Sequence, residues 1–441
     1  MNCAAYDRTS PESILEFAKR LSGKTLAETV DMSQVTENLR NKGDLGSLVE
    51  KFFFEYEPNS SSEPDFPEAG VELKTTGVKR KSKGGYQAKE RLTLTMINYM
   101  ELVNENWETS SLMEKCHLML LLFTLYEKEV AVFNRRFVLE PILFKFPADD
   151  LLQIKLDWQK IKDKIENGKA HELSEGDTYY LSASRKGSGG ENEAPKRQPF
   201  SNVAAKARAF ALKPMYVNRI IDIHTVEAGV LEVAKNSGIE EATKVKFAPY
   251  LGKSVDEISN LINCYKRGKN DKNFQRRLAM RMLGAVGSSV PEIDKAGIEI
   301  KTIRVNKNWR PFEAMSFPAF NYLDIINEDW EDSKFFEKVE QRFLFVIFRK
   351  GDDGETRLEK IQYWNMPYLD REEARRVWEL TRSRVAIDAS DLPKSRESRV
   401  AHVRPKARNA SDTLLTPQGT HLVKKCFWLN KNYIGEVIRN I

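Results

Sequence analysis

An internal repeat constrains this chain more than any other feature, because short blocks from its first half return in the same order in its second half. The sequence AGVELK at residues 69–74 returns as AGIEIK at residues 296–301. Further along, NENWETS at residues 104–110 returns as NEDWEDS at residues 327–333. This order predicts two copies of one domain in tandem.

The spacing of the repeated blocks also locates an insertion. Glu72 and Glu299 are 227 positions apart, whereas Trp107 and Trp330 are 223 positions apart. The first copy therefore carries about four extra residues, which we place in the segment KRKSKGGYQAKE. Two weaker echoes flank these blocks: LSGKT at 21–25 with LGKSV at 251–255, and RAFALKPMY at 208–216 with KCFWLNKNY at 425–433.

Within each copy the apolar residues predict alternating strands and helices, an α/β class. Residues 45–56 have helical spacing, and residues 149–168 form an amphipathic pattern that ends at a glycine. The continuous apolar run at 117–127 is typical of a central strand buried on both faces. The stretches GVELKTTGV and RLTLTMINY alternate as strands do. We expect a loop at 187–199, a connector near 222–245, and domains at 1–225 and 240–441.

The composition is that of a folded protein with room for two or three domains, because 41% of the 441 residues are hydrophobic and 30% are charged. No apolar run approaches the roughly 18 residues of a membrane span, and no secretory signal opens the sequence, so we expect a cytoplasmic protein without a membrane partner. The net charge of +6 is only mildly favourable to nucleic acid. The four cysteines are scattered singly, which indicates neither a zinc site nor a disulfide framework.

Three charged residues lie within the strand-like run PDFPEAGVELKTTG at 64–77. Alternate residues of a strand share a face, so Glu72 and Lys74 should point together, and a turn could bring Asp65 beside Glu72. Two neighbouring carboxylates repel each other, which favours a bound divalent cation such as Mg²⁺. A lysine beside that cation can orient an attacking water and stabilise charge on a phosphate.

Taken alone, Glu-x-Lys more often marks a solvated strand face than a catalytic site. The surrounding blocks supply context, since DFPEAGVELKT resembles the core of the MutH family of mismatch-repair endonucleases. The whole chain resembles the two-copy type II restriction endonucleases of that family, which cut at GATC. The similar blocks include KGDLGSLVEKF, ERLTLTMINY, NENWETS, GKAHELSEG and RAFALK.

The resemblance implies two tandem restriction-endonuclease-like domains, each a mixed sheet flanked by helices. It also implies Mg²⁺-dependent hydrolysis of double-stranded DNA, with a cut on the 5′ side of the guanine that leaves 5′-phosphate overhangs. Asp65, Glu72 and Lys74 match the catalytic triad of this nuclease fold. The resemblance further implies metal ligation by Asp65, Glu72 and the backbone carbonyl of Leu73, a supporting carboxylate at Glu50, and a second active-site lysine at Lys115.

The second copy departs from this pattern at two positions. Glu292, not aspartate, stands seven residues before Glu299, and Met280 takes the place of Glu50. A methionine cannot bind a hard cation, and small displacements in a metal site cost large factors in rate. We therefore predict that the first half cuts DNA and that the second half is inactive and binds a DNA site as an allosteric effector. The alternative is that the second half is only a folding partner.

Three basic segments are candidates for contacts with DNA. VKRKSKGGYQAKER, at 78–91, could hold backbone phosphates on a flexible loop, although a solvated hairpin tip is the simpler alternative. YYLSASRKGSGG and its counterpart HVRPKARN resemble the base-reading loop of the family, and KARAFALKPMY interleaves basic and aromatic residues. The candidate residues are Lys79, Arg80, Lys81, Lys83, Lys186, Lys206, Arg208, Lys213, Arg404 and Lys406.

One further hypothesis concerns methylated DNA. In the MutH family an aromatic residue follows the phenylalanine near the adenine whose methylation is sensed. Here Ala211 takes that position in the first copy and Trp428 in the second. We therefore expect the cutting half to tolerate N6-methyladenine.

Rival functions remain open at this point. One is a MutH-like mismatch-repair strand nickase, which the doubled architecture disfavours, and another is a catalytically dead DNA-binding protein. Two chains could also dimerise on DNA. The SGKT sequence at 22–25 lacks the upstream glycine of a phosphate-binding loop, so no ATP is implied. We interpret Thr25-x-x-Glu28 and Ser254-x-x-Glu257 as helix capping boxes.

Overall fold

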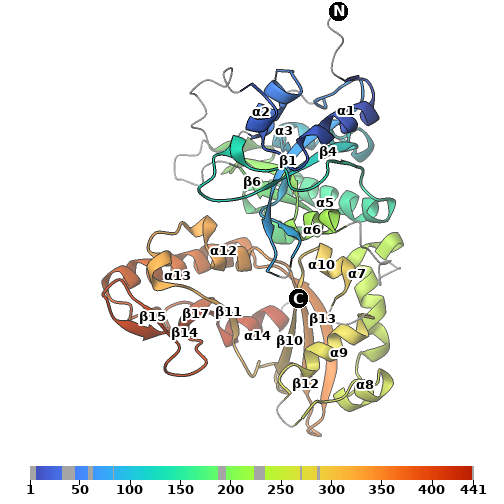
Figure 1. Cartoon of the computed structure of the whole chain (residues 1–441). Helices are drawn as coiled ribbons and strands as arrows, with labels where there is room; N and C mark the ends of the chain where they lie inside the picture. The colour runs from blue at the N-terminus through green and yellow to red at the C-terminus, as the bar shows by residue number, and fades with distance from the viewer. Residues whose placement is uncertain are drawn as a thin grey trace, which may run out of the picture. The chain divides into compact units, whose positions relative to one another are not determined.

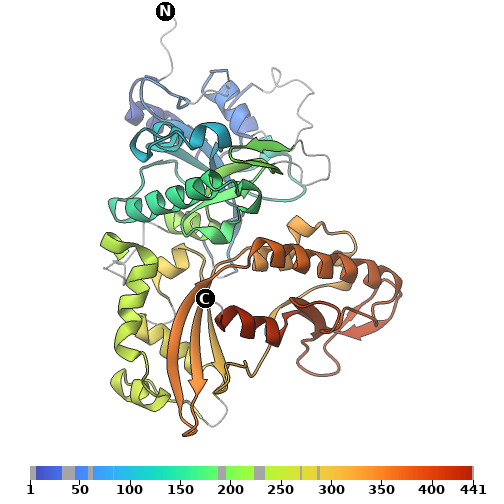
Figure 2. The same ribbon diagram turned by 180° about the vertical axis from the view of Figure 1, so that it is seen from behind.

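A computed structural model describes residues 6–31, 45–57, 63–82, 84–186, 195–222, 234–268, 271–285 and 289–439 (Figures 1 and 2). The chain divides into two compact units, and the mixed sheets and flanking helices of each confirm the predicted fold class. The first unit comprises Met1–Leu173, Thr178–Ala228 and Lys295–Gly297, and the second comprises Ser174–Asp177, Gly229–Asp294 and Ile298–Ile441.

The main sheet of the first unit has the order β2-β1-β4-β5. β1 (Glu72–Arg80) runs parallel to β4 (Met119–Leu125), while β2 (Tyr86–Ala88) and β5 (Ile142–Phe144) pair antiparallel at the edges. Every residue of β4 is buried, which confirms the central strand predicted from its apolar run. β1 is therefore fixed along one side by a fully buried strand.

A second, antiparallel sheet of the first unit has the order β3-β9-β6. It consists of β3 (Leu92–Met96), β9 (Arg208–Leu212) and β6 (Leu181–Arg185), and it packs with the helix α5 (Ala148–Glu166). The hairpin of β7 (Lys196–Gln198) and β8 (Ser201–Ala205) lies beyond β6 in the chain. Part of the loop expected at 187–199 is therefore strand, and residues 187–194 lie outside the described residues.

The second unit repeats both sheets. β10 (Glu299–Val305) runs parallel to β12 (Phe343–Lys350), which pairs antiparallel with β13 (Thr356–Trp364). The second sheet is antiparallel, in the order β11-β17-β14, and a hairpin of β15 and β16 follows its edge strand β14 in the chain. The remaining bounds are β11 (Met315–Ala319), β14 (Ala401–Pro405), β15 (Thr413–Leu415), β16 (His421–Val423) and β17 (Lys425–Leu429).

The predicted insertion lies between β1 and β3 of the first unit. Glu72 and Leu92 are twenty residues apart, whereas their counterparts Glu299 and Met315 are sixteen apart, a difference of four. In the first unit this longer stretch contains the β1–β2 hairpin. The hairpin extends the strand that carries the charged motif.

Long helices occupy matching places in the two units. α5 spans nineteen residues and ends before Gly168, whose φ is +68°, and α13 (Tyr368–Ile387) spans twenty residues and packs beside α12 (Lys334–Val339) and β14 (Figures 1 and 2). The other helices are α1 (Pro11–Ala18), α2 (Leu45–Leu48), a π-helical turn η4 (Val49–Phe53), α3 (Tyr99–Leu102), α4 (Ser111–Cys116), α6 (Pro214–Ile221), α7 (Ala234–Phe247), α8 (Val255–Leu261), α9 (Phe274–Met282), α10 (Pro291–Lys295), α11 (Tyr322–Ile325) and α14 (Lys431–Arg439).

Both predicted capping boxes are present. The Thr25 backbone N–H donates to Glu28 at 2.7 Å, and the Glu28 N–H donates back to the Thr25 hydroxyl at 3.2 Å. Ser254 and Glu257 make the same reciprocal bonds at 2.6 and 3.2 Å. These segments begin helices, as the sequence indicated.

The repeated tryptophans pack against the long helices. Trp107 meets Trp158 of α5 with ring centroids 5.8 Å apart, and Trp330 meets Trp378 of α13 at 5.7 Å. Both contacts are near edge-on or tilted, the geometries that aromatic pairs prefer. The buried Trp330 and the half-buried Trp107 therefore each pack against a buried tryptophan of a long helix.

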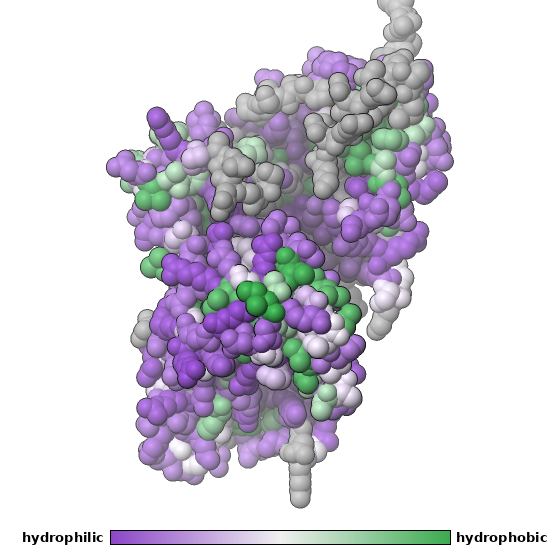
Figure 3. Space-filling model, turned by 90° about the vertical axis from the view of Figure 1, so that its left-hand side faces the viewer, coloured by the Kyte–Doolittle hydropathy of each residue, from purple (hydrophilic) through white to green (hydrophobic). Residues whose placement is uncertain are grey.

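The exposed surface is largely polar. The face shown in Figure 3 is mostly hydrophilic, with a small group of apolar residues among polar ones. Across the described part of the chain, none of the helices combines the length and apolar character that a membrane crossing requires.

Candidate active site

The start of β1 positions two of the predicted site residues. Glu72 is the first residue of the strand and is only 2% exposed, and Lys74 Nζ lies 2.6 Å from Glu72 Oε1. The intervening Leu73 and the preceding Val71 are buried in the apolar core of the first unit. The strand alternation therefore places Glu72 and Lys74 on one face, as expected.

A tight turn brings Asp65 to the same place. Phe66 and Val71 exchange backbone hydrogen bonds of 2.9 and 3.2 Å, which closes the turn between Asp65 and β1. The Asp65 backbone N–H donates to Glu72 Oε2 at 3.1 Å, and the Leu73 N–H donates to Asp65 Oδ2 at 2.8 Å. Asp65 and Glu72 therefore lie side by side.

Glycine is required within this turn. Gly70 has a φ of +63°, which L side chains rarely adopt. A Cβ atom there would also come within 3.1 Å of the His117 ring. The turn that delivers Asp65 thus depends on a residue without a side chain.

Burial and neighbouring charges tune the carboxylate of Glu72. Burial raises the pKa of Glu72 to about 7, Lys74 opposes this rise, and Asp65 adds to it. Lys115 Nζ lies 3.7 Å from Glu72 Oε1. Burial is the largest influence on Lys74 and acts to lower its pKa, but Glu72, Cys116 and Asp65 together outweigh it and leave that pKa raised, so Lys74 stays cationic.

Glu50 and a residue that the sequence reasoning missed complete the cluster. Glu50 lies on η4, and a Cβ at Gly46 would be 3.8 Å from its Oε1. The Tyr56 hydroxyl is buried, and among the described residues it has no hydrogen-bond partner. Burial, followed by the charges of Asp65, Glu50 and Glu72, raises the pKa of Tyr56 well above its ordinary value. In the sequence Tyr56 fits the apolar spacing of the predicted helix at 45–56, so no signal indicated that it belongs to the site.

The donor set fits a hard divalent cation. Glu50, Asp65 and Glu72 bring three carboxylates near the ammonium groups of Lys74 and Lys115, which gives a formal net charge of −1 when every carboxylate is ionised. Within the described residues no group of three or more His, Cys, Asp or Glu side chains is arranged to hold a metal alone. Mg²⁺ does not require such a group, because it commonly binds one or two carboxylates and keeps several waters.

The corresponding place in the second unit is arranged differently. Glu299 begins β10, is 26% exposed, and accepts from Lys301 Nζ at 2.6 Å and from Lys338 Nζ at 3.2 Å. Lys338 stands 223 positions after Lys115, the spacing of the repeated tryptophans, and is therefore its counterpart. Burial alone would raise the pKa of Glu299, but Lys301 and Lys338 lower it below its ordinary value.

Two substitutions in the second unit change its chemistry. Met280 is buried on α9 at the position of Glu50, and Glu292 is buried on α10. The guanidinium of Arg276 donates to the Ile300 carbonyl at 3.4 Å, and Ile300 is the counterpart of Leu73. Basic side chains thus contact both Glu299 and the neighbouring carbonyl.

The first basic segment forms a hairpin, which is the simpler of the two alternatives that the sequence left open. Lys79 Nζ lies 5.7 Å from the Tyr126 ring centroid, and the Arg80 guanidinium lies 5.6 Å from the Tyr86 ring. Lys81 Nζ pairs with Asp222 at 3.2 Å. Lys83 lies outside the described residues. Pairing with β2 and contacts with aromatic rings hold this segment.

Lys186 lies close to the carboxylate cluster. Its Nζ donates to Thr93 Oγ1 at 2.6 Å. Burial lowers the pKa of Lys186, Glu90 opposes this effect, and the charges of Arg91 and Lys74 add to it. Lys206, in contrast, is exposed.

Arg208 and Lys213 point inward, which conflicts with the prediction that they contact DNA. The Arg208 side chain is buried and donates to the Ala183 carbonyl at 2.5 Å and to the Leu173 carbonyl. Lys213 is also buried, and its Nζ donates to the Thr178 carbonyl at 2.5 Å. Both cations are used to hold backbone carbonyls of the first unit, because buried charges need such partners.

The two candidate base-reading residues of the second unit are exposed. The Arg404 guanidinium lies 3.8 Å from the ring centroid of Trp428. Lys406 Nζ donates to the Phe317 carbonyl at 2.7 Å. Ala211, the first-unit counterpart of Trp428, is fully buried on β9.

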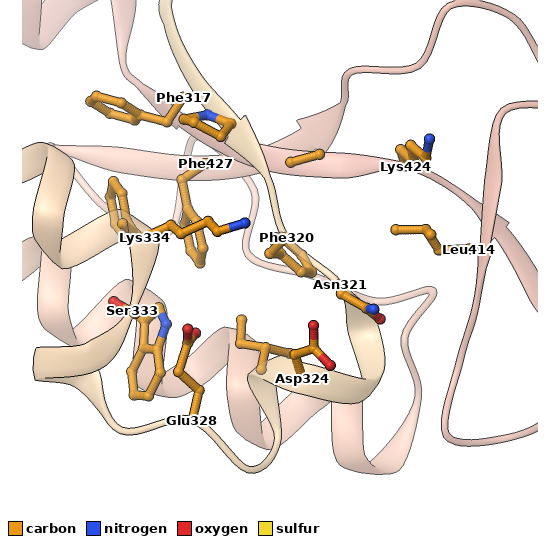
Figure 4. A pocket seen from close by; sticks show the side chains of 15 residues that line it. Phe317, Phe320, Asn321, Asp324, Glu328, Ser333, Lys334, Leu414, Lys424 and Phe427 are labelled. Atoms are coloured by element: carbon orange, nitrogen blue, oxygen red, sulfur yellow. The ribbon is translucent and has the colours of Figure 1, made fainter. Parts of the chain in front are cut away.

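A separate cavity of the second unit is formed by α11, α12 and β11. Figure 4 shows the aromatic rings of Phe317, Phe320 and Phe427 around it, with the carboxylates of Asp324 and Glu328 at its side. Burial raises the pKa of Glu328, and Asp324 adds to the rise. Glu299 and its lysines are not among the residues that line this cavity.

Comparisons with known proteins give the same family as the resemblance seen in the sequence. The profile of the MutH family, described as DNA mismatch repair enzyme MutH, matches residues 54–157 and again residues 284–376. The two matches fall in the two copies of the repeat.

Individual relatives cover different shares of the chain. The type II restriction enzyme Sau3AI of Staphylococcus aureus is 30% identical over 98% of this chain and 98% of its own length. The DNA mismatch repair protein MutH of Shewanella woodyi is 27% identical over 48% of this chain and 92% of its own length. The MutH protein of Shigella flexneri is 30% identical over 38% of this chain and 73% of its own length.

Proposed function

This chain belongs to the family of MutH-like type II restriction endonucleases, and from that premise we propose that it cuts double-stranded DNA at GATC with the aid of Mg²⁺. The chain is a site-specific deoxyribonuclease. The proposal adds the target, a cut on the 5′ side of the guanine that leaves 5′-phosphate overhangs, and the metal. The observation that supports it is the buried cluster of Asp65, Glu72 and Lys74 at the start of β1.

In this proposal Asp65, Glu72 and the Leu73 carbonyl hold Mg²⁺, and Glu50 supports it. A bound Mg²⁺ supplies positive charge that activates water and offsets the charge on the phosphate. Lys74 stays cationic beside Glu72 and orients the attacking water. Lys115 approaches the same carboxylate and adds a second positive charge toward the scissile phosphate.

The second half takes a different role in the proposal. It does not cut, because Lys301 and Lys338 hold Glu299 and Met280 offers no oxygen ligand, and it binds a DNA site as an allosteric effector. One catalytic cluster per chain cannot cut both strands of a palindrome at once. Either two chains therefore meet on the DNA, or one chain nicks each strand in turn, and neither route uses ATP.

Digestion of a plasmid of known GATC positions tests the proposed reaction. We expect purified protein with only Mg²⁺ added to produce duplex breaks at those positions, and Asp65→Ala to lose cutting by about 10³-fold or more while still binding DNA. Glu68→Gln, an exposed carboxylate in the same turn, is the matched control and should cut normally.

Other outcomes would separate the rival functions. Nicks in one strand only, with dependence on added mismatch-recognition proteins, would favour a repair nickase. Binding without any cutting by the wild type would favour a DNA-binding protein without catalytic activity.

A further inference from the structure

The cluster at the start of β10 repeats the framework of the candidate active site but not its charge. Glu299, Lys301 and Lys338 occupy the places of Glu72, Lys74 and Lys115. The two lysines of the second unit are also more accessible, with side chains 25% and 24% exposed against 17% and 12% in the first unit. Solvent and ligands can therefore reach them.

An arginine is the main difference between the two clusters. With Leu48 aligned to Leu278, Arg276 stands at the position of Gly46. Gly46 lies against β1, because a Cβ there would be 3.5 Å from Thr75 Oγ1. Where α9 of the second unit carries the guanidinium of Arg276, the first unit therefore has Gly46 and no side chain.

The guanidinium of Arg276 contacts a backbone carbonyl next to Glu299. Arg276 donates to the Ile300 carbonyl at 3.4 Å. Ile300 corresponds to Leu73, whose carbonyl is a proposed metal ligand in the first unit. A fixed cation of the protein therefore takes up the electrostatic role that a metal would have at this carbonyl.

The net charge of the cluster changes sign as a result. Arg276, Lys301 and Lys338 supply three positive charges, whereas Glu299 and Glu292, the sequence counterparts of Glu72 and Asp65, supply two negative ones when both are counted as ionised. The sum is +1, compared with −1 in the first unit. A net positive cluster repels a divalent cation and attracts an anion.

We propose that this second-unit cluster, formed by Arg276, Lys301 and Lys338 around Glu299, binds a backbone phosphate of DNA without a divalent cation. The inference rests on the proposed function, in which the second half binds DNA. Guanidinium and ammonium groups are the usual protein partners of phosphate, and the guanidinium can donate two parallel hydrogen bonds. The phosphate stays intact because no metal activates a water beside it.

Binding in EDTA removes any contribution from a metal at the first cluster, and the Arg276 variant then reports on the second-unit cluster. Without a divalent cation the first cluster carries −1 and repels phosphate, and no strand is cut. The probe is a fluorescein-labelled GATC duplex, titrated with the full-length chain across a series of salt concentrations and followed by fluorescence anisotropy. We expect tight binding by the wild type. Arg276→Ala should weaken binding about tenfold and reduce the slope of log K against log salt by about 1.

Two variants serve as controls. Arg281→Ala removes an exposed arginine from the same helix and should leave both the affinity and the slope unchanged. Arg276→Lys keeps the charge and should restore most of the slope. A thermal melt of each variant confirms that it is folded.

Either of two results would overturn the inference. Arg276→Ala could bind in EDTA with the affinity and salt slope of the wild type, or the wild type could fail to bind the duplex until Mg²⁺ or Ca²⁺ is added. Both results leave the proposed cutting reaction standing, since the plasmid digestion tests that reaction separately.

Discussion

Asp65 and Glu72 are seven residues apart, yet backbone N–H groups of Leu73 and Asp65 hold their two carboxylates side by side. The backbone N–H of Asp65 holds the Glu72 carboxylate, and the N–H of Leu73, next to Glu72, holds the Asp65 carboxylate. The backbone of the turn therefore fixes the pair, and long flexible side chains are not needed. Tyr56 closes one side of the cluster, with its ring 5.2 Å from that of Phe66. Its buried hydroxyl has no hydrogen-bond partner among the described residues.

A matched pair of tyrosines tests that statement. Tyr56→Phe removes a buried hydroxyl without a partner among the described residues, so it should leave the free energy of unfolding unchanged or raise it by about 1 kcal/mol. Tyr6→Phe removes a hydroxyl that donates to the Phe54 carbonyl at 2.8 Å, and should cost about 1 kcal/mol. Urea denaturation in EDTA measures both. A loss of stability in Tyr56→Phe as large as in Tyr6→Phe would contradict the prediction.

At the scale of elements, the end of the long helix α5 depends on a single glycine, Gly168. Its predicted end at a glycine is confirmed, because Gly168 adopts a φ of +68° just beyond the helix. The structure adds a second reason for glycine. A Cβ at this position would lie 2.6 Å from the carbonyl oxygen of Phe200, at the turn between β7 and β8.

Two glycines with left-handed backbone therefore tolerate substitution differently. Gly168→Ala should lower the free energy of unfolding by about 3 kcal/mol, since strain of about 1 kcal/mol adds to a clash with backbone. Gly23 has a φ of +72° but no atoms within 4 Å of its would-be Cβ, so Gly23→Ala should cost only the strain. Equilibrium unfolding in urea distinguishes them, and equal losses would show that the Phe200 contact relaxes without cost.

For the whole molecule, duplication allows the two copies to specialise. The sheets, hairpins and tryptophan pairs of the first unit are repeated in the second. The cluster at the start of the strand that carries the charged motif nevertheless holds more acids than bases in one copy and more bases than acids in the other. In the proposed function this difference separates cutting from effector binding.

Effector binding has a direct kinetic consequence. Cleavage of a plasmid with one GATC site should accelerate several-fold when a short GATC duplex is added in excess, because the second half is then occupied. A duplex of the same length without GATC is the control. Initial rates measured across effector concentrations report the effect, and simple competitive inhibition at every concentration would show that the second half carries no effector site.

Much of this protein was readable from its sequence, because repeats, strand alternation, capping boxes and a helix-ending glycine depend on residues close together in the chain. The two-copy fold, the buried strand at 119–125 and the common face of Glu72 and Lys74 all follow from such local patterns. Tertiary structure decided which charges are neutralised and by what. Nothing in the sequence distinguishes Arg208, Lys213 and Arg276 from exposed basic residues, yet each donates to a backbone carbonyl at least 24 residues away. Packing between segments that are distant in the sequence decides which group pairs with a charged side chain. The local spacing of residues therefore cannot predict that partner.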